Sequence, residues 1–275
     1  MDSQIKSKVF FSKIISSEKL AELSKLLSKD FNQGKIGIKI DINTKNEKNA
    51  INPVFYRPIV DYFQGTVIDC KSLFISSEKN TQEFSKYFET EILDINDPDD
   101  ELEIPKGKIL KKTYIGHNLK KYDSFIIISN FYKTQGLGIG AISELSLGLS
   151  SKKSKALQLT GGKSEDFSEI KNKKCENKIF KEASAEVAST NYNYIKRNAL
   201  FINLLGKIDS GNCDNIGILA STDPVAIDQA SVDLIYNNKN NDLIKKLEEL
   251  EEKYLIDCSY KLGFGKKDYE LICIN

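Results

Sequence analysis

The sequence predicts an α/β fold with a mostly parallel sheet and flanking helices. Short apolar segments alternate along the chain with amphipathic helical ones, which is the pattern of repeated β–α units. One of them, Ser124–Ser129, is apolar almost throughout, as strands buried on both faces are. The chain has 275 residues, 40% of them hydrophobic, which is enough to bury a sizeable core. We expect a single domain over residues 1–275, with two α/β lobes divided in the polar segment 150–178 as the alternative.

The first two elements follow from leucine spacing and from strand alternation. An amphipathic helix is expected over residues 17–30, where leucines recur at helical intervals: Leu20, Leu23, Leu26 and Leu27. Ser16 or Ser17 can cap this helix, because a serine hydroxyl accepts a hydrogen bond from a free amide of the first turn. The segment Lys35–Ile40 alternates between polar or small and apolar residues, so it is expected to be a strand.

A loop, a helix and a second strand follow this strand. A polar loop runs from Asp41 to Asn52, and Pro53 then opens a helix through Asp61. The short strand Thr66–Asp69 completes the unit. Parallel sheets built from such units bind ligands at the carboxyl ends of their strands. Asp41 and Asp69, which stand at two such ends, are therefore predicted to line a ligand site.

The rest of the chain repeats this alternation. The further strands are expected at Leu200–Leu205 and Ile216–Ala220. The further helices are expected at Glu83–Phe88, Ala141–Leu149 and Ile179–Ser189, and along the apolar face formed by Leu243, Leu247, Leu250 and Tyr254. Between them, the polar and lysine-rich segment Ser150–Lys178 is expected to be a loop or an excursion.

The charge balance excludes several classes of function. Forty cationic and 39 anionic side chains give a net charge of +1, which disfavours a strongly basic nucleic-acid binder. No apolar run approaches the ~18–20 residues that a membrane-spanning helix needs. The N-terminal residues are polar, and the apolar run Val9–Phe11 is too short for the core of a signal peptide. We therefore expect a cytoplasmic protein without nucleic-acid or membrane partners; the sequence carries no signal for an oligomeric state.

The cysteine and histidine content disfavours a metal centre. The five cysteines are widely spaced and form no Cys-x-x-Cys pair, which argues against a zinc knuckle or an iron–sulfur cluster. The single histidine, His117, cannot build a multi-histidine site. We predict no iron–sulfur cluster and no metal site, and any metal would need carboxylate ligands.

A glycine-rich turn follows the buried strand Ser124–Ser129. Gly136, Gly138 and Gly140 precede Ala141 in the form G-x-G-x-x-A, the pattern of a dinucleotide-binding turn. The gap between strand and glycines is longer than that turn allows, so a dinucleotide is disfavoured. Two interpretations stay open: backbone amides and a helix N-terminus that bind another anion, or a purely structural turn.

Two aspartates stand where a helix is expected to begin. Asp223 precedes Pro224, a pairing typical of a helix cap followed by proline at the first helical position. The alternative role is a ligand contact, because Asp223 follows a predicted buried strand. Asp228 lies on the second turn of the same helix and is a further candidate.

Arg57 is one of only two arginines among 40 cationic residues. Arginine offers a planar fork of donors to carboxylates and phosphates that lysine cannot offer. Arg57 is therefore predicted to hold an anionic group. The alternative is a surface arginine stacked on Tyr56.

Three blocks of this sequence resemble the family called domain of unknown function 362. The most specific block is Ile202-Asn203 followed by Ile216-Gly-Ile-Leu-Ala-Ser221-Thr-Asp223-Pro-Val-Ala-Ile-Asp228-Gln-Ala-Ser-Val-Asp233-Leu-Ile. The N-terminal block runs from Lys35-Ile-Gly-Ile-Lys39-Ile-Asp41 through Tyr56-Arg57-Pro58 to Asp69, and the middle block runs from Asp123 through the glycine-rich turn to Gly148. Together they cover most of the chain from about residue 35 to 235.

The departures from the family pattern limit what the resemblance implies. Many members carry a four-cysteine iron–sulfur module, which has no counterpart here. The histidines of the family fall on Asp41 and near Thr134 or Gln135, and its Lys-Asn pair falls on Ser143 and Glu144. The resemblance therefore implies the fold and the general position of a pocket, but no metal or redox chemistry.

Together these observations predict an α/β protein of unknown activity that binds a small anionic ligand in a pocket at the carboxyl ends of its strands. The predicted ligand-binding residues are Asp41, Arg57, Asp69, Gly136, Gly138, Gly140, Asp223 and Asp228. No catalytic residue is predicted, and whether the protein is an enzyme stays open. The alternative is a structural or regulatory relative without catalysis, whose site has decayed and which acts through protein contacts.

Overall fold

The structure, a computed structural model, describes residues 6–30, 34–40, 42, 52–70, 82, 84–93, 99–131, 137–206 and 215–274. In this part of the chain the main sheet has eight strands, in the order β10-β1-β9-β8-β7-β2-β3-β4. They are β1 (Ser7–Ser12), β2 (Ile36–Ile40), β3 (Thr66–Asp69), β4 (Thr90–Ile92), β7 (Ser124–Asn130), β8 (Ala199–Leu205), β9 (Gly217–Ser221) and β10 (Tyr269–Cys273).

Most neighbouring strands of this sheet run parallel. Five successive strands of the sheet are parallel to one another, namely β8, β7, β2, β3 and β4, and β1 is parallel to β10. Strand β9 is antiparallel to both of its neighbours, β8 and β1. The predicted α/β fold with a mostly parallel sheet is confirmed. The reversed direction of β9 places its carboxyl end at the edge of the sheet opposite to the carboxyl ends of β2, β3, β7 and β8.

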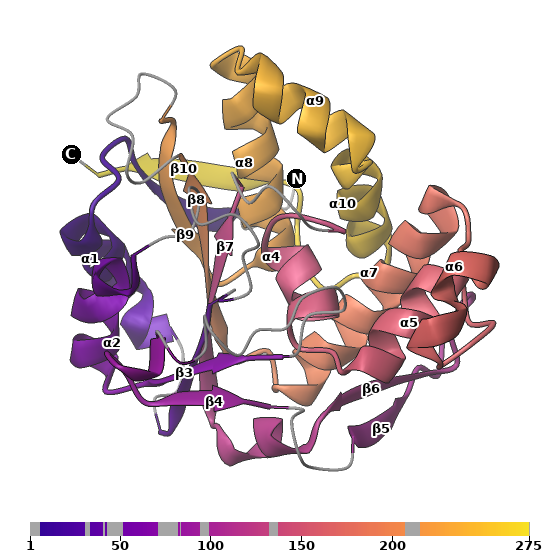
Figure 1. The fold of residues 1–275 in the computed structure, drawn as a ribbon. Coiled ribbons are helices and arrows are strands. Elements are labelled where there is room, and N and C mark those ends of the chain that lie inside the picture. Colours follow the sequence, from indigo (N-terminus) through magenta and orange to yellow (C-terminus); the bar gives the residue numbers. More distant parts are fainter. Residues whose placement is uncertain are drawn as a thin grey trace.

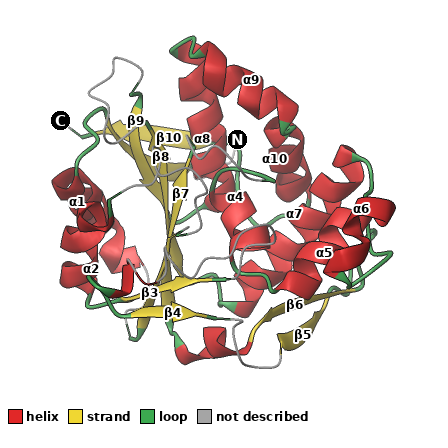
Figure 2. Cartoon of the chain, in the orientation of Figure 1, coloured by secondary structure: helices red, strands yellow, loops and turns green. Residues whose placement is uncertain are grey.

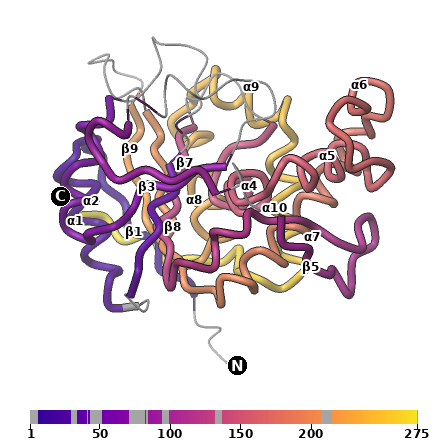
Figure 3. Tube along the Cα trace, turned by 60° about the horizontal axis from the view of Figure 1, so that its bottom comes forward, coloured from indigo at the N-terminus to yellow at the C-terminus, as the bar shows by residue number. Residues whose placement is uncertain are grey.

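Helices cover both faces of the sheet. Helices α1 and α2 lie on one face, and α4, α7, α8 and α10 lie on the other (Figure 1 and Figure 2). The turned view in Figure 3 shows the same division, with α5 and α6 farthest from α1 and α2. The helices are α1 (Ser17–Leu27), α2 (Arg57–Phe63), α4 (Ala141–Ser143), α5 (Lys152–Thr160), α6 (Ile170–Lys173), α7 (Asn177–Tyr194), α8 (Pro224–Asn237), α9 (Asn241–Glu249) and α10 (Glu252–Lys261).

Shorter elements complete the described fold. The 3₁₀ turns are η1 (Ser28–Asp30), η3 (Pro53–Tyr56), η4 (His117–Lys121) and η6 (Phe167–Glu169). A π-helical turn, η5 (Glu144–Gly148), continues directly from α4. The strands β5 (Asp99–Glu103) and β6 (Lys112–Gly116) form an antiparallel pair apart from the main sheet, and β6 contacts α5. No helix in the described part of the chain has the length and apolar character of a membrane-spanning segment.

The hydrophobic core consists mainly of two clusters, one on each face of the sheet. Alternate residues of a strand point to opposite faces, so β2 contributes Ile36, Ile38 and Ile40 to the cluster beneath α1 and α2. The same alternation directs Gly37 and Lys39 toward the other face, where α4 and η5 pack. A strand with apolar residues on one face and a glycine and a lysine on the other needs a polar partner on that second face.

Several predicted elements are confirmed with small changes in their ends. Helix α1 begins at Ser17, and the Ser16 hydroxyl caps it by accepting from Lys19 N at 3.2 Å. The strand predicted over Ser124–Ser129 is β7, which extends to Asn130. The predicted helix Glu83–Phe88 lies partly outside the described residues.

The segment predicted as a loop or excursion, Ser150–Lys178, is instead largely helical and contains α5 and α6. Its polar side chains are buried because they bond to one another. Gln158 donates from Nε2 to Ser154 Oγ at 3.2 Å, and Ser184 of α7 donates to Gln158 Oε1 at 3.1 Å. The prediction of a loop from the polar composition of this segment is therefore wrong, because polar side chains that are hydrogen-bonded can pack in a protein interior.

Two predicted helices are interrupted. The helix expected along Leu243 to Tyr254 is divided into α9 and α10 at Glu251, whose φ of 49° lies in the left-handed region. The helix expected over Ala141–Leu149 changes from α to π geometry at Glu144. The apolar periodicity is nearly the same on both sides of each break, so the sequence pattern did not reveal either one.

Candidate functional site

A buried lysine lies between two carboxylates near the carboxyl ends of the parallel strands. Lys39 is the fourth residue of β2 and is 1% exposed. Its Nζ lies 2.9 Å from Asp69 Oδ1 and 3.0 Å from Glu144 Oε2. These three side chains come from β2, β3 and the turn η5, and we call them the Lys39 cluster.

Asp69 is held firmly within this cluster. Lys39 pairs with Ile68 in the strand register, so Asp69 stands one residue nearer the carboxyl edge of the sheet. Besides Lys39, its carboxylate accepts from the amide of Cys70 at 2.8 Å and from the amide of Ile42 at 3.2 Å. These backbone and side-chain donors set the orientation of Asp69, which is 3% exposed.

Glu144 reaches Lys39 from the first residue of the π-helical turn. The amide of Leu149 donates to the carbonyl of Glu144 at 3.1 Å, the bond between residues five apart that defines this geometry. Gly148 makes the approach feasible, because a Cβ at this position would lie 2.3 Å from Glu144 Oε2 and 3.0 Å from Lys39 Cε. Glycine at 148 is therefore a condition for the Lys39–Glu144 contact.

Side chains of neighbouring helices support the π-helical turn. A π-helix leaves carbonyls without the usual partner four residues on. Asn191 of α7 donates to the carbonyl of Leu145 at 2.8 Å, and Gln158 of α5 donates to the carbonyl of Ser146 at 3.3 Å. These buried donors satisfy the carbonyls of the turn and so hold the backbone that carries Glu144.

The Lys39 cluster carries one formal positive and two formal negative charges in a buried place. Removing such charges from water is unfavourable unless they are paired and hydrogen-bonded. Apolar residues of similar volume are often at least as stabilising as a buried ion pair. A buried charged cluster at the edge where parallel α/β sheets bind ligands is thus a candidate functional site.

Four successive amides, the last two of the glycine-rich turn and the first two of α4, donate to protein side chains. Gly140 N donates to Ser129 Oγ at 2.8 Å, and Ile139 N donates to Glu252 Oε1 at 3.3 Å. The next two amides, at residues 141 and 142, donate to Asp228 at 2.7 and 2.9 Å. This arrangement favours the structural interpretation of the turn over an anion-binding one. Gly136 lies outside the described residues.

Close packing explains two of the glycines in this turn. Gly140 has a φ of +96°, and a Cβ there would lie 2.6 Å from Asp228 Oδ1. A Cβ at Gly138 would lie 2.2 Å from Ser143 Oγ. Both glycines are therefore required by the fold of the turn, whatever further role they have.

Asp228 lies beneath the turn as a buried cap of α4. Its carboxylate accepts from Ala141 N, Ile142 N and Asn203 Nδ2, the last at 2.8 Å. Burial raises the pKa of Asp228 from its ordinary value of 3.8 to about 7, although the three donors favour the ionised form. Through these donors Asp228 supports α4 and the π-helical turn that follows it.

A second buried ion pair joins α7 and α10 beside the same turn. Lys181 Nζ lies 2.9 Å from Glu252 Oε1 and donates to the carbonyl of Leu137 at 3.2 Å. Burial raises the pKa of Glu252, while the Lys181 ammonium opposes this shift. The pair holds the described part of the turn through Leu137 and Ile139.

Asp223 lies at the other edge of the sheet. It caps α8 as predicted, because its Oδ1 accepts from Val225 N at 2.9 Å and from Ala226 N at 3.0 Å. Its Oδ2 accepts from Ser7 Oγ at 2.7 Å and from Lys266 N at 2.9 Å. Since β9 is antiparallel, the structure does not bring Asp223 to the edge where Asp69 lies.

Arg57 lies at the start of α2 with its side chain 45% exposed. Its guanidinium group stacks over the ring of Phe88 at 5.3 Å and donates to the carbonyl of Tyr87 at 3.5 Å. The alternative predicted from the sequence was a surface arginine stacked on Tyr56, but the ring that Arg57 stacks on is that of Phe88. Asp41, the remaining predicted ligand residue, lies outside the described residues.

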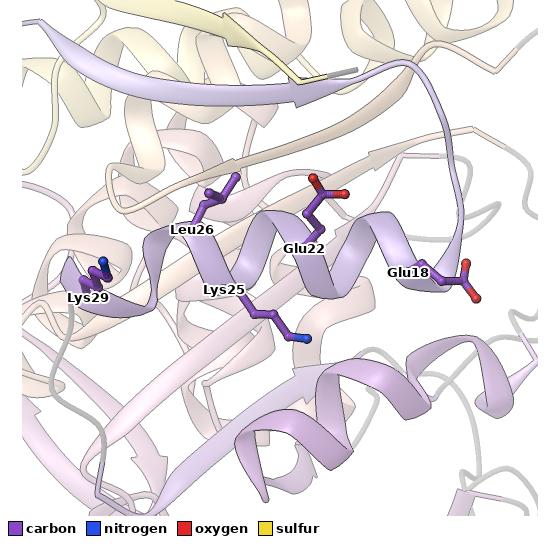
Figure 4. Close-up of a pocket in the computed structure, with 5 residues that line it drawn as sticks. All are labelled: Glu18, Glu22, Lys25, Leu26 and Lys29. Carbon is purple, nitrogen blue, oxygen red and sulfur yellow. The ribbon is translucent and has the colours of Figure 1, made fainter.

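The pocket of about 350 Å³ shown in Figure 4 belongs to a different surface. It lies along the outer side of α1 and η1, and its lining residues are Glu18, Glu22, Lys25, Leu26 and Lys29. Helix α1 packs on the face of the sheet opposite to α4 and η5, so this pocket is separate from the Lys39 cluster. Among the described residues, no group of three or more histidine, cysteine or carboxylate side chains is suited to hold a metal ion.

Two residues of the cluster, Lys39 and Glu144, were not among the predicted site residues. A signal for Lys39 is present in the sequence: it stands between Ile38 and Ile40 in a strand that reads as buried, and a buried lysine needs an anionic partner. Glu144 carries no comparable signal. It is 105 residues away from Lys39 in sequence, and its approach depends on the π-helical turn.

Comparison with known families agrees with the resemblance noted in the sequence. The family model described as Domain of unknown function (DUF362) matches residues 36–233. No curated protein matched the chain. The matched range begins at the first residue of β2 and ends within α8, so it contains all three members of the Lys39 cluster.

Proposed function

The chain belongs to the domain of unknown function 362 family, and we propose that it binds a small anionic ligand at the carboxyl edge of β2, β3 and β7, with Lys39 as the cation that receives it. The observation that carries this proposal is the burial of Lys39 between Asp69 and Glu144 at that edge. No reaction is proposed, since the arrangement supports binding alone.

The chemistry of lysine supports an anionic ligand. An ammonium group donates charge-assisted hydrogen bonds to carboxylate and phosphate oxygens, and these are stronger than bonds between neutral groups. Lys39 is 1% exposed, so a bond to it would form in a place of low dielectric constant, where it is stronger than in water. The position at the carboxyl ends of parallel strands is the one at which such sheets bind ligands.

The proposal is tested by measuring binding of inorganic phosphate and of acetate to the wild type and to Lys39→Met by isothermal titration calorimetry. Methionine keeps the length and apolar stem of lysine but has no charge. We expect Lys39→Met to weaken binding by about tenfold or more, because the charge-assisted bond is lost. Equal affinities of the wild type and Lys39→Met would contradict the proposal.

Two further variants separate binding from general effects. Lys245→Met changes the net charge equally at a side chain that is 77% exposed on α9, so it should leave affinity unchanged. Lys39→Arg keeps the charge but not the compact ammonium group, and we expect it to retain measurable binding. Circular dichroism of each variant shows whether it is folded.

A structural or regulatory role without ligand is the second candidate, and the glycine-rich turn favours it. The four successive amides from Ile139 to Ile142 donate to Ser129, Asp228 and Glu252, so these four are already occupied by protein acceptors. This candidate predicts that neither phosphate nor acetate binds the wild type. It also predicts that Lys39→Met changes only the free energy of unfolding.

A further inference from the structure

The two carboxylates that contact Lys39 differ in the number of hydrogen-bond donors that hold them. We infer that Glu144 competes with the ligand for Lys39: its carboxylate occupies the side of Lys39 at which the oxyanion group of the ligand binds. This inference rests on the proposed function and adds that Glu144 is the group that the ligand displaces. The ligand class is a small oxyanion, either a carboxylate or a phosphate.

Asp69 is the fixed partner of Lys39. It accepts from Lys39, from Cys70 N and from Ile42 N, and its side chain is 4% exposed. Displacing it would leave two backbone amides without an acceptor, and unsatisfied buried donors are strongly unfavourable. Asp69 therefore stays in place when a second anion approaches Lys39.

Glu144 is the exchangeable partner. Among the described residues, its carboxylate accepts from one donor, Lys39 Nζ. Its side chain is 11% exposed, compared with 2% for that of Lys39. The backbone that carries it is a π-helical turn, a rare geometry that is frequent at functional sites. Moving Glu144 away thus breaks fewer interactions than moving Asp69.

The charge of the Lys39 cluster favours this exchange. The Lys39 cluster already has two formal negative charges for one positive charge. A third carboxylate or a phosphate beside Lys39 would add another like charge in a buried place, where repulsion is poorly screened. An anion therefore binds to Lys39 more favourably when the charge of Glu144 leaves the cluster.

Gly148 makes the vacated space suitable for another oxyanion. A Cβ at position 148 would lie 2.3 Å from the oxygen that Glu144 presents to Lys39. An oxygen atom at this place thus lies directly against the backbone of the turn. A ligand oxygen that replaces the one from Glu144 finds the same contact with Lys39 and the same room beside Gly148.

The test measures binding of inorganic phosphate, and in a second arm of acetate, to the wild type and to Glu144→Gln. The glutamine has the shape of glutamate but no charge, so it competes weakly for Lys39. We expect Glu144→Gln to bind one of the two anions at least about tenfold more tightly than the wild type does, because the charged group that competes for Lys39 is removed. The arm with the larger gain identifies the oxyanion.

Matched variants distinguish the possible failures. Glu22→Gln makes the same change of net charge at an exposed side chain of α1 and should leave affinity within about twofold. If Glu144→Gln binds no more tightly than the wild type while Lys39→Met loses binding, the inference is wrong and the proposed function stands. If neither anion binds the wild type or Glu144→Gln, both are wrong.

A shorter side chain tests the same idea without removing the charge. Glu144→Asp keeps a carboxylate on the turn but draws it back by one methylene from Lys39. We expect its affinity to lie between those of the wild type and Glu144→Gln. An affinity equal to that of the wild type, in a variant shown to be folded by circular dichroism, would contradict the competition.

Discussion

Replacement of Asp228 by asparagine removes a buried carboxyl group whose pKa burial raises from 3.8 to about 7. Between these two pH values the folded protein holds a proton on Asp228 that the unfolded chain has released. The free energy of unfolding therefore falls as the pH rises through this range. The stabilising contribution is complete below pH 3.8 and is lost as the pH passes through about 7.

The size of this effect follows from the pKa change. At about 1.4 kcal/mol for each pKa unit, the difference between 3.8 and about 7 corresponds to about 4 kcal/mol. Of this, about 3 kcal/mol is lost between pH 5 and pH 8, because part has been lost already at pH 5. Asp228 is 4% exposed, so solvent screens the effect little.

Asparagine at position 228 has no proton to lose, so its own contribution does not change with pH. It offers one acceptor oxygen to Ala141 N and Ile142 N, and one of these amides therefore loses its partner. Leaving a buried amide without an acceptor lowers the free energy of unfolding by about 1–3 kcal/mol. We thus expect Asp228→Asn to be less stable than the wild type at pH 5, with the difference shrinking or reversing by pH 8.

Urea unfolding followed by circular dichroism measures this difference at both pH values and at constant ionic strength. Asp242→Asn, at an exposed position in the first turn of α9, serves as the control. We expect the difference between wild type and Asp228→Asn to change by about 3 kcal/mol from pH 5 to pH 8. A difference that is the same at both pH values would refute the reasoning from burial.

Three further substitutions test the contacts of Gly148, Asp223 and Arg57. Gly148→Ala should lower the free energy of unfolding by about 1–3 kcal/mol in urea unfolding, because the new Cβ overlaps Glu144; an unchanged value would contradict that packing. Asp223→Asn should lower the free energy of unfolding by about 1–3 kcal/mol, more than a change of cap alone, because the second carboxylate oxygen also accepts from two donors. Its phosphate affinity should stay the same; a loss of affinity at unchanged stability would instead support the predicted ligand role. Arg57→Lys should lower stability by about 0.5–1 kcal/mol as the stack on Phe88 is lost, and a fall in phosphate affinity without a fall in stability would show that it binds the ligand.

The sequence alone determined the class of the fold and much of its local structure. The apolar run of β7 indicated a strand buried on both faces, and Ser16 and Asp223 indicated the starts of α1 and α8. These signals are local, because a cap bonds to amides within three residues and a strand shows its burial in its own side chains. The family resemblance belongs here too, and the family match over residues 36–233 confirms it.

The predicted ligand site was only partly informative, for a reason that lies in strand direction. Asp69 was placed correctly at the carboxyl end of β3, since the β–α–β unit around it is parallel. Asp223 was expected at the same edge, but the antiparallel direction of β9 moves it to the other one. A buried strand has the same apolar pattern in either direction, so its sequence does not state which way it runs.

Only the tertiary structure decided which charges meet. Lys39 and Glu144 are 105 residues apart, and their contact depends on the π-helical turn, on its donors from α5 and α7, and on the missing side chain of Gly148. The glycine-rich turn likewise read as a possible anion site until Asp228 and Glu252 were seen to accept from its amides. Such partners come from distant segments, and packing of the whole chain selects them, because buried charges and amides persist only where some other part of the fold satisfies them.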